Sequence, residues 1–236
     1  MARGCGVQSI MTHIVIINPN TSEATTAMMT DIARQSVPAG ISVEGVTAAR
    51  GVPMILNGNE LAASADGVVQ MGLTAASRAD GIIVSAFGDP GLEQLRQMTD
   101  IPIIGICEAS MLEAAFGGRR FGIATVTPDL VESFAAKAVS LGLANLFTGT
   151  RLTSGDPISL SFEPERLQTA LAIAVKECQE LDGAEVVIIG GGPLGRAATQ
   201  LQQQLSAPVI APIESATKLL LKRMFPLASV AASLAQ

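Results

Sequence analysis

The chain has 236 residues, with 15 Lys and Arg against 21 Asp and Glu, and a formal net charge of −6 at pH 7. Phosphate contacts need clustered positive charge and bases stack on aromatic rings, so this acidic chain without Trp or Tyr is not expected to bind nucleic acid. Apolar residues make up 48% of it, but their runs are much shorter than the roughly 18 residues of a membrane span, so no membrane partner is expected.

Short apolar runs alternate with helical patterns along the chain. Residues 1–11 show no periodicity, and we expect a flexible extension there. The central runs are apolar throughout, which is typical of strands covered on both faces in a parallel α/β sheet. The predicted strands are 14–17, 42–46, 81–86, 103–106, 121–126, 149–152, 186–189 and 209–211.

Helix starts are marked by capping side chains and by prolines. Ser22, Asp89 and Thr127 are the expected N-caps of helices that follow them in the sequence. The predicted helices are 23–34, 91–98, 129–141, about 164–180, 193–205 and 214–224.

The sequence also contains an internal repeat. Residues 79–86 are similar to 184–191, and residues 102–109 to 208–215, an offset of 105–106 residues. Chance similarity between apolar strands is the alternative explanation. The repeat predicts two similar Rossmann-like α/β lobes with parallel sheets, related by a pseudo-two-fold axis. We expect lobe 1 to comprise 12–107 plus 214–236, and lobe 2 to comprise 108–213.

A site between the lobes follows from this arrangement, because open α/β sheets bind ligands beyond the carboxyl ends of their strands. The loops there are small and polar and lead into helix N-termini, whose N–H groups favour an anion. Their glycines lack nucleotide-binding spacings, so we expect a small carboxylate or cyclic amide and no cofactor. The expected binding residues are Asn18, Asn20, Ser85, Ala86, Phe87, Gly88, Thr125, Val126, Thr127, Gly190, Gly191 and Gly192.

Two carboxylates occupy equivalent places in the repeat. Glu108 and Glu214 could face each other across the site as acid and base, or each could simply complement a helix dipole. Cys107 could be an activated nucleophile or a buried structural thiol. The three cysteines lie far apart without metal spacing and there is one histidine, so we expect reduced thiols in a cytoplasmic protein and no metal site.

Several of these segments together resemble the aspartate/glutamate/hydantoin racemase family, closest to its hydantoin and allantoin racemase branch. They are 17–22 (INPNTS), 87–92 (FGDPGL), 102–109, 118–127 and 208–219. The resemblance implies two similar α/β lobes with the site between them and a homo-oligomer. It also implies chemistry at the carbon next to a carbonyl, since related folds carry out racemisation, decarboxylation and isomerisation.

The chain departs from the family at the residues that matter most for racemisation. Family racemases use two cysteines, one on each face of the substrate, and the resemblance places them at Ala86 and Gly191. Neither side chain can accept a proton, so the two-thiol route is not available.

Three functions therefore stay open. The first is an enzyme of racemase or lyase type whose base is Glu108, Glu214 or a bound water. The second is a hydrolase that opens a small cyclic amide with an activated water. The third is a family member that binds a small ligand without catalysis.

Overall fold

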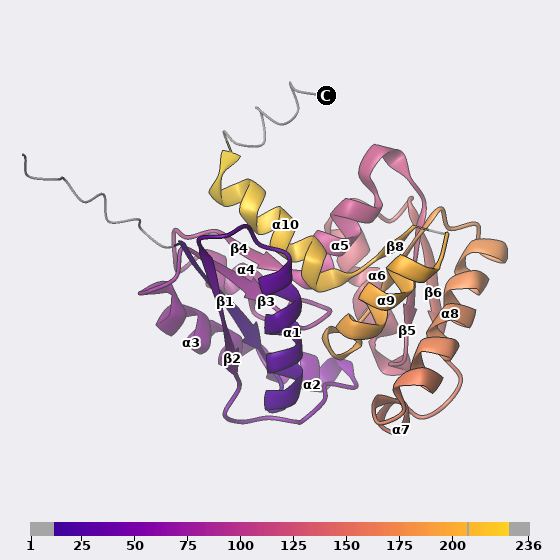
Figure 1. Ribbon diagram of the computed structural model, residues 1–236, viewed down its shortest axis with the longest axis horizontal. Coiled ribbons are helices and arrows are strands. Elements are labelled where there is room, and N and C mark those ends of the chain that lie inside the picture. The colour runs from indigo at the N-terminus through magenta and orange to yellow at the C-terminus, as the bar shows by residue number, and fades with distance from the viewer. Residues whose placement is uncertain (1–11, 207, 227–236) are drawn as a thin grey trace, which may run out of the picture.

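The computed structural model describes residues 12–206 and 208–226, which form two lobes side by side (Figure 1). The predicted extension at 1–11 and the last ten residues of lobe 1 lie outside the described residues. No helix in the described part of the chain has the length and apolar character needed to cross a membrane.

Each lobe is built on one parallel four-stranded sheet. The first sheet has the order β2-β1-β3-β4 and the second the order β6-β5-β7-β8, so the repeat of the sequence is also a repeat of topology. The strands are β1 (Thr12–Asn18), β2 (Ile41–Thr47), β3 (Gly81–Val84), β4 (Ile103–Gly105), β5 (Phe121–Thr125), β6 (Phe147–Leu152), β7 (Val186–Ile189) and β8 (Val209–Ile210). The predicted α/β fold with two parallel-sheet lobes is confirmed, and each predicted strand overlaps an observed one.

Helices cover both faces of each sheet. In lobe 1, α1 (Glu23–Gln35) and α10 (Pro212–Met224) pack on one face, while α3 (Ala65–Ala76) and α4 (Leu92–Arg96) pack on the other. In lobe 2 the corresponding pairs are α5 (Ile106–Ala114) with α6 (Val131–Ser140), and α8 (Pro164–Glu180) with α9 (Gly195–Gln204). This double cover explains why β3 and β7 are apolar and buried at every position.

Two helices are exchanged between the lobes. Helix α5 follows directly on β4 of lobe 1 but packs against β7 and β8 of lobe 2, whereas α10 follows β8 and packs against β3 and β4. The two helices also pack against each other, at the centre of Figure 1. The buried cluster around them contains residues of both sheets, so the lobes share one core.

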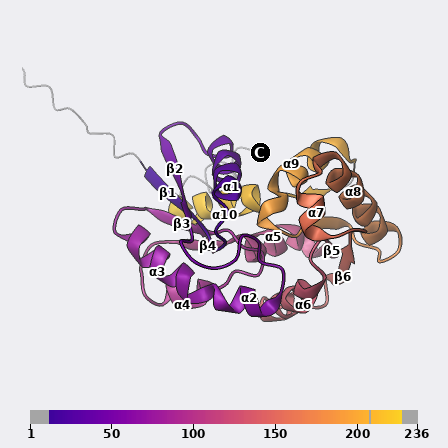
Figure 2. The same ribbon diagram turned by 90° about the horizontal axis from the view of Figure 1, so that it is seen from below.

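The sequence did not indicate three of the helices, α3, α2 (Gly58–Ala63) and α7 (Pro157–Ser161), and it indicated α5 only through the possible place of Glu108 in a first helical turn. Residue 106 was expected to end a strand, but it begins α5 without any intervening loop. Short α2 sits between the lobes beside α6 (Figure 2), and a Cβ built on Gly58 would lie 3.7 Å from the Ser133 hydroxyl. Short 3₁₀ turns at Phe116–Gly118, Pro128–Leu130 and Gly192–Leu194 complete the chain.

The three expected N-caps have different outcomes. The Ser22 side chain accepts a hydrogen bond from the Thr25 amide and caps α1, as predicted. The Thr127 hydroxyl makes no capping bond and instead pairs with the Thr125 hydroxyl at 3.1 Å. The prediction that Asp89 caps the helix after it is wrong, because α4 begins after the left-handed Gly91 and Asp89 turns toward α5.

Candidate functional site

The first wall of the site is the loop after β3. Ser85 fastens its start, since both its amide and its hydroxyl donate to the Ile17 carbonyl, at 2.9 and 2.7 Å. Gly88 follows with φ +133°, and a Cβ there would come within 2.5 Å of Leu61. A side chain at position 88 would therefore be both strained and crowded. Between these fixed points, Ala86 and Phe87 face the second lobe.

Behind this loop, the end of β1 carries a buried amide network. The Asn18 side-chain amide donates to Asn20 Oδ1 at 2.8 Å and to the Thr26 hydroxyl at 2.9 Å, and its oxygen accepts from the Asn20 main chain at 3.2 Å. Asn20 Oδ1 in turn accepts from the Ser22 amide at 2.9 Å. Asn18 thus holds the turn in place, and Asn20 is the member of the pair that lines the cavity.

The second wall comes from the ends of β5 and β7. The Thr125 hydroxyl donates to the Gly190 carbonyl at 2.6 Å, which joins the two loops of lobe 2. The lobes then approach closely, because a Cβ built on Gly192 would lie 2.6 Å from the Ser85 carbonyl oxygen. A Cβ on Gly190 would lie 3.2 Å from the Phe87 ring. Glycine at these positions lets the two walls meet.

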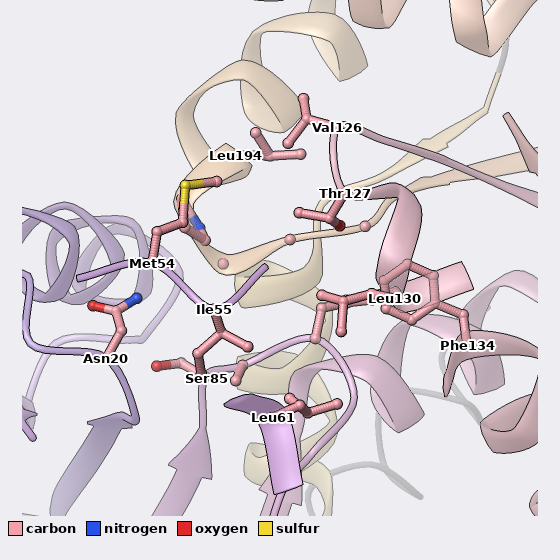
Figure 3. Close-up of a pocket in the computed structure, with 16 residues that line it drawn as sticks. Asn20, Met54, Ile55, Leu61, Ser85, Val126, Thr127, Leu130, Phe134 and Leu194 are labelled. Carbon is pink, nitrogen blue, oxygen red and sulfur yellow. The ribbon is translucent and has the colours of Figure 1, made fainter. Parts of the chain in front are cut away.

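A cavity lies where the walls meet, and Figure 3 shows its lining. Its empty volume is about 480 Å³, which includes space open to solvent. Apolar side chains dominate, and the polar side chains are those of Asn20, Ser85 and Thr127. The lining residues are Asn20, Met54, Ile55, Leu61, Ser85, Ala86, Phe87, Val126, Thr127, Leu130, Phe134, Gly190, Gly191, Gly192, Pro193 and Leu194.

Nine of the twelve expected binding residues line this cavity. Asn18, Gly88 and Thr125 do not, and they instead support the loops that do. Sequence reasoning missed Met54, Ile55 and Leu61 from the segment before and within α2. It also missed Leu130, at the end of the 3₁₀ turn before α6, and Phe134 in α6. The hydrophobicity of these residues is all that the sequence shows, and it does not distinguish a cavity wall from a core.

The two candidate carboxylates lie elsewhere. Both are in the first turn of a helix, as the alternative expectation had it. Glu108 is buried and forms an ion pair with Arg96, with 3.0 Å to Arg96 Nη1. Glu214 accepts a hydrogen bond from the Thr199 hydroxyl at 3.0 Å. Neither carboxylate belongs to the cavity lining, and no residue of that lining in the described chain carries a titratable side chain.

A buried ion pair joins the lobes just behind the cavity. The Asp89 side chain is fully buried and accepts from the amides of Cys107 at 2.9 Å and Glu108 at 2.8 Å, so it caps α5 from a distance. Lys137 Nζ of α6 lies 3.0 Å from Asp89 Oδ2, the oxygen that also accepts from the Glu108 amide. One turn earlier on α6, the Phe134 ring meets Phe87 edge to face with centroids 5.1 Å apart. Helix α6 of lobe 2 therefore contacts the loop after β3 at two places, through Lys137 and through Phe134.

The two cysteines of the described residues, Cys107 and Cys178, are not placed for catalysis. Cys107 is fully buried in α5 outside the cavity lining, and burial together with the Asp89 carboxylate raises the pKa of its thiol well above the usual value. Burial also raises the pKa of Cys178, in α8, to about 12. Both are therefore protonated, inert thiols at neutral pH. Cys5 lies outside the described residues.

The cavity does offer main-chain donors. Within the described chain, the amides of Phe87, Gly191 and Gly192 have no hydrogen-bond acceptor, although all three residues line the cavity. Phe87 and Gly192 are buried, and an unpaired amide at a buried position is costly unless a ligand or water accepts from it. These amides therefore suit a carboxylate, a carbonyl or an enolate oxygen. No cluster of three or more His, Cys, Asp or Glu side chains in residues 12–206 and 208–226 could hold a metal ion.

Comparison with known proteins places this architecture among racemases. The sequence model of the Asp/Glu/Hydantoin racemase family matches residues 14–220. A hydantoin racemase of Paenarthrobacter aurescens is 29% identical over 209 residues, which are 87% of this chain and 88% of the relative.

Two solved structures are also similar along most of their length. An allantoin racemase from Klebsiella pneumoniae has a TM-score of 0.80 and 28% identity, covering 89% of this chain and 86% of that one. An allantoin racemase from Pseudomonas fluorescens has a TM-score of 0.84, covering 89% and 90%, and at 22% identity it supports the fold alone.

Proposed function

The chain belongs to the Asp/Glu/hydantoin racemase family, and from this membership and the chemistry of the cavity we propose that it acts at the carbon next to a carbonyl in a small carboxylate or cyclic ureide. The names of the relatives, hydantoin and allantoin racemase, favour the ureide ring. A small cavity with unpaired main-chain amides in both walls suits a small ureide ring.

One observation carries the choice of reaction: the lining combines unpaired amides with no titratable side chain. Proton abstraction from carbon needs a base in the wall. Positions 86 and 191, where the family resemblance expects thiols, hold Ala and Gly and line the cavity. Loss of CO₂ reaches the same enolate without a base, so we propose decarboxylation as the reaction that this lining supports best.

The proposed reaction starts from a carbon that bears both a carboxylate and a second carbonyl, in an open malonate or in a ureide ring. The bond from this carbon to the carboxylate breaks, its electron pair stays as an enolate, and neutral CO₂ leaves. Water then protonates the carbon, and the hydroxide left over combines with CO₂ as bicarbonate.

The cavity walls suit each part of this step. The amides of Phe87, Gly191 and Gly192 would donate to the enolate oxygen, the type of contact that contributes most to stabilising such an intermediate. The leaving carboxylate would face apolar walls such as Leu61 and Phe134, which favour neutral CO₂ over the charged group.

Ring opening of a cyclic amide is not part of the proposal. An activated water would need a group that accepts its proton, and the lining holds none in the described chain. None of the relatives named above is described as a hydrolase.

The test is CO₂ release from malonate, from phenylmalonate and from 5-carboxyhydantoin. Ala86→Leu fills the cavity from its lobe 1 wall and is expected to abolish release. Ala27→Leu makes the same change on the exposed side of α1 and should leave release unchanged. Wild-type protein that releases no CO₂ from any of the three, or an Ala86→Leu variant as active as wild type, would refute the proposal.

A further inference from the structure

A groove between α5 and α10 lies apart from the cavity of the candidate site. These are the two helices that the lobes exchange, and they pack against each other at the centre of Figure 1. The α5–α10 groove has an empty volume of about 960 Å³, which includes space open to solvent. None of its lining residues also lines the cavity. A molecule bound in the groove would therefore leave the cavity free.

The groove has large apolar side chains from both helices. Phe116, in the 3₁₀ turn that follows α5, is 79% exposed, and Leu112 within α5 is 39% exposed. Leu219 of α10 lines the same space from the other helix. Large apolar side chains that two elements present to one concave surface are typical of a surface that a ligand covers.

The polar side chains between the two helices are already paired. The Ser215 hydroxyl donates to the Glu113 carboxylate, and the Ala109 carbonyl oxygen lies 3.2 Å from the same hydroxyl. Glu113 also forms an ion pair with Lys218 at 3.7 Å. An apolar group can therefore cover Ser215 without leaving its hydrogen bond unmade.

Positive charge surrounds this apolar surface. The lining carries three cations, Arg119, Lys218 and Lys222, and one carboxylate, Glu113, on a chain whose net charge is −6. Lys222 is exposed, and none of the ion pairs in the described chain includes it. The excess of cations favours an anion in the groove.

The same contacts restrict the ligand to a single negative charge. Arg119 is held at the end of α5, where its Nη2 donates to the Glu113 carbonyl at 2.7 Å and its Nε to the Ala114 carbonyl at 3.1 Å. Lys222 and the shared Lys218 are left to meet an anion. A second anionic group would lie near the Glu113 carboxylate and the negative end of the α5 dipole, and both would repel it.

We infer that the α5–α10 groove binds a monocarboxylate with an extended apolar body, such as a medium-chain alkyl acid. The carboxylate lies at Lys222 and Lys218. The alkyl chain covers Phe116, Leu112 and Leu219. This inference does not depend on the reaction proposed above, because the groove and the cavity have no lining residue in common.

The test is calorimetry at about 0.15 M salt, where long-range charge effects are screened, with octanoate, butyrate and octylammonium as probes. Octanoate should bind at least about tenfold more tightly than butyrate, the gain from burying about two of its four additional methylene groups. Octylammonium has a chain of the same length with the opposite charge. It should bind at least about fivefold more weakly than octanoate.

Two variants test the apolar and the charged part of the groove. Phe116→Ser should weaken octanoate at least about fivefold, and its matched control is Phe162→Ser, because Phe162 is 81% exposed but lies outside the groove. Lys222→Glu should also weaken octanoate at least about fivefold and should not weaken octylammonium. Its control is Arg223→Glu, in the same last turn of α10 but outside the lining. Both controls should bind octanoate within about twofold of wild type.

The possible results decide between the groove and other places for the ligand. Weaker binding in Phe116→Ser and Lys222→Glu, with both controls unchanged, supports the inference. It is overturned if octanoate does not bind, if octylammonium binds equally well, or if Phe162→Ser weakens octanoate while Phe116→Ser does not. Sedimentation of wild type and Phe116→Ser tests a second copy of the chain as the occupant. A lower mass for the variant would make the groove a contact between copies and overturn the inference.

Discussion

Replacing Asp89 by asparagine tests how much the buried ion pair between Asp89 of lobe 1 and Lys137 of lobe 2 stabilises the fold. Asparagine has nearly the same shape, so the change removes charge without opening a cavity. The wild-type carboxylate is fully buried, accepts from two α5 amides and faces Lys137 at 3.0 Å. An asparagine oxygen can keep one of the two amide bonds, but its NH₂ group must face the other amide or the ammonium group.

The expected loss follows from these contacts. Removing one partner of a buried ion pair typically costs about 3–5 kcal/mol, because the remaining charge is left uncompensated. The Lys137 side chain is 13% exposed, so little water can replace the carboxylate. The amide that loses its acceptor contributes part of the same cost. We therefore expect Asp89→Asn to lower the free energy of unfolding by about 3–5 kcal/mol.

Urea unfolding at pH 7, followed by circular dichroism, measures this change. Lys137→Met should lower the free energy of unfolding by a comparable amount. The double variant should lose clearly less than the sum of the two single variants, since the two residues share one interaction. The control is Glu93→Gln, which removes a carboxylate that is 71% exposed from its contact with Arg96 and should cost less than about 1 kcal/mol. A loss below about 1 kcal/mol for Asp89→Asn, or strictly additive costs, would refute the cross-lobe ion pair.

The remaining predictions concern glycine positions and pH. Gly192→Ala should lower the free energy of unfolding in urea by at least about 2 kcal/mol, because its Cβ would lie 2.6 Å from the Ser85 carbonyl oxygen. The control is Gly67→Ala in α3, where a Cβ would have no atom within 4 Å, and this variant should be as stable as wild type or more stable. Gly191→Cys should lower the free energy of unfolding by about 1–3 kcal/mol, since φ at this position is +155° and Leu194 lies 3.1 Å from the new Cβ. Ala86→Cys should leave the melting temperature nearly unchanged. Burial opposes protonation of Lys137, but the Asp89 carboxylate outweighs it and raises the pKa above the usual 10.5. The stability advantage of wild type over Lys137→Met should hold from pH 7 to about 10 and shrink as the pH rises beyond the usual 10.5 and through the raised folded pKa. An advantage that grows as the pH rises above 10.5 would contradict this assignment.

Much of the architecture was predictable because the sequence contains an internal repeat. The apolar strands and the matching segments at 79–86 and 184–191 predicted two similar lobes, and both sheets have the same strand order. The loops after these strands were predictable as site walls, since parallel strands end at one edge of a sheet.

What the sequence could not show depends on contacts between distant segments. Asp89 looks like a local N-cap, but its left-handed backbone turns it toward α5, whose own start at Gly105 has no side chain to cap it. For Glu108 the sequence allows a base or a paired carboxylate, and no local pattern marks Arg96 as the partner that the structure places beside it. Met54 and Phe134 are ordinary apolar residues, and only the approach of the two lobes makes them cavity walls.

The most direct test of the account is proton NMR in D₂O with phenylmalonate and 5-benzylhydantoin. The account predicts that phenylmalonate loses CO₂ and takes deuterium at the carbon next to the remaining carboxylate, faster than in buffer. It also predicts that the C5 proton of 5-benzylhydantoin, which only a base could remove, exchanges no faster with protein than without it. Rapid protein-dependent exchange of that C5 proton, with phenylmalonate left intact, would contradict the central claim that the cavity reaches an enolate without a base of its own.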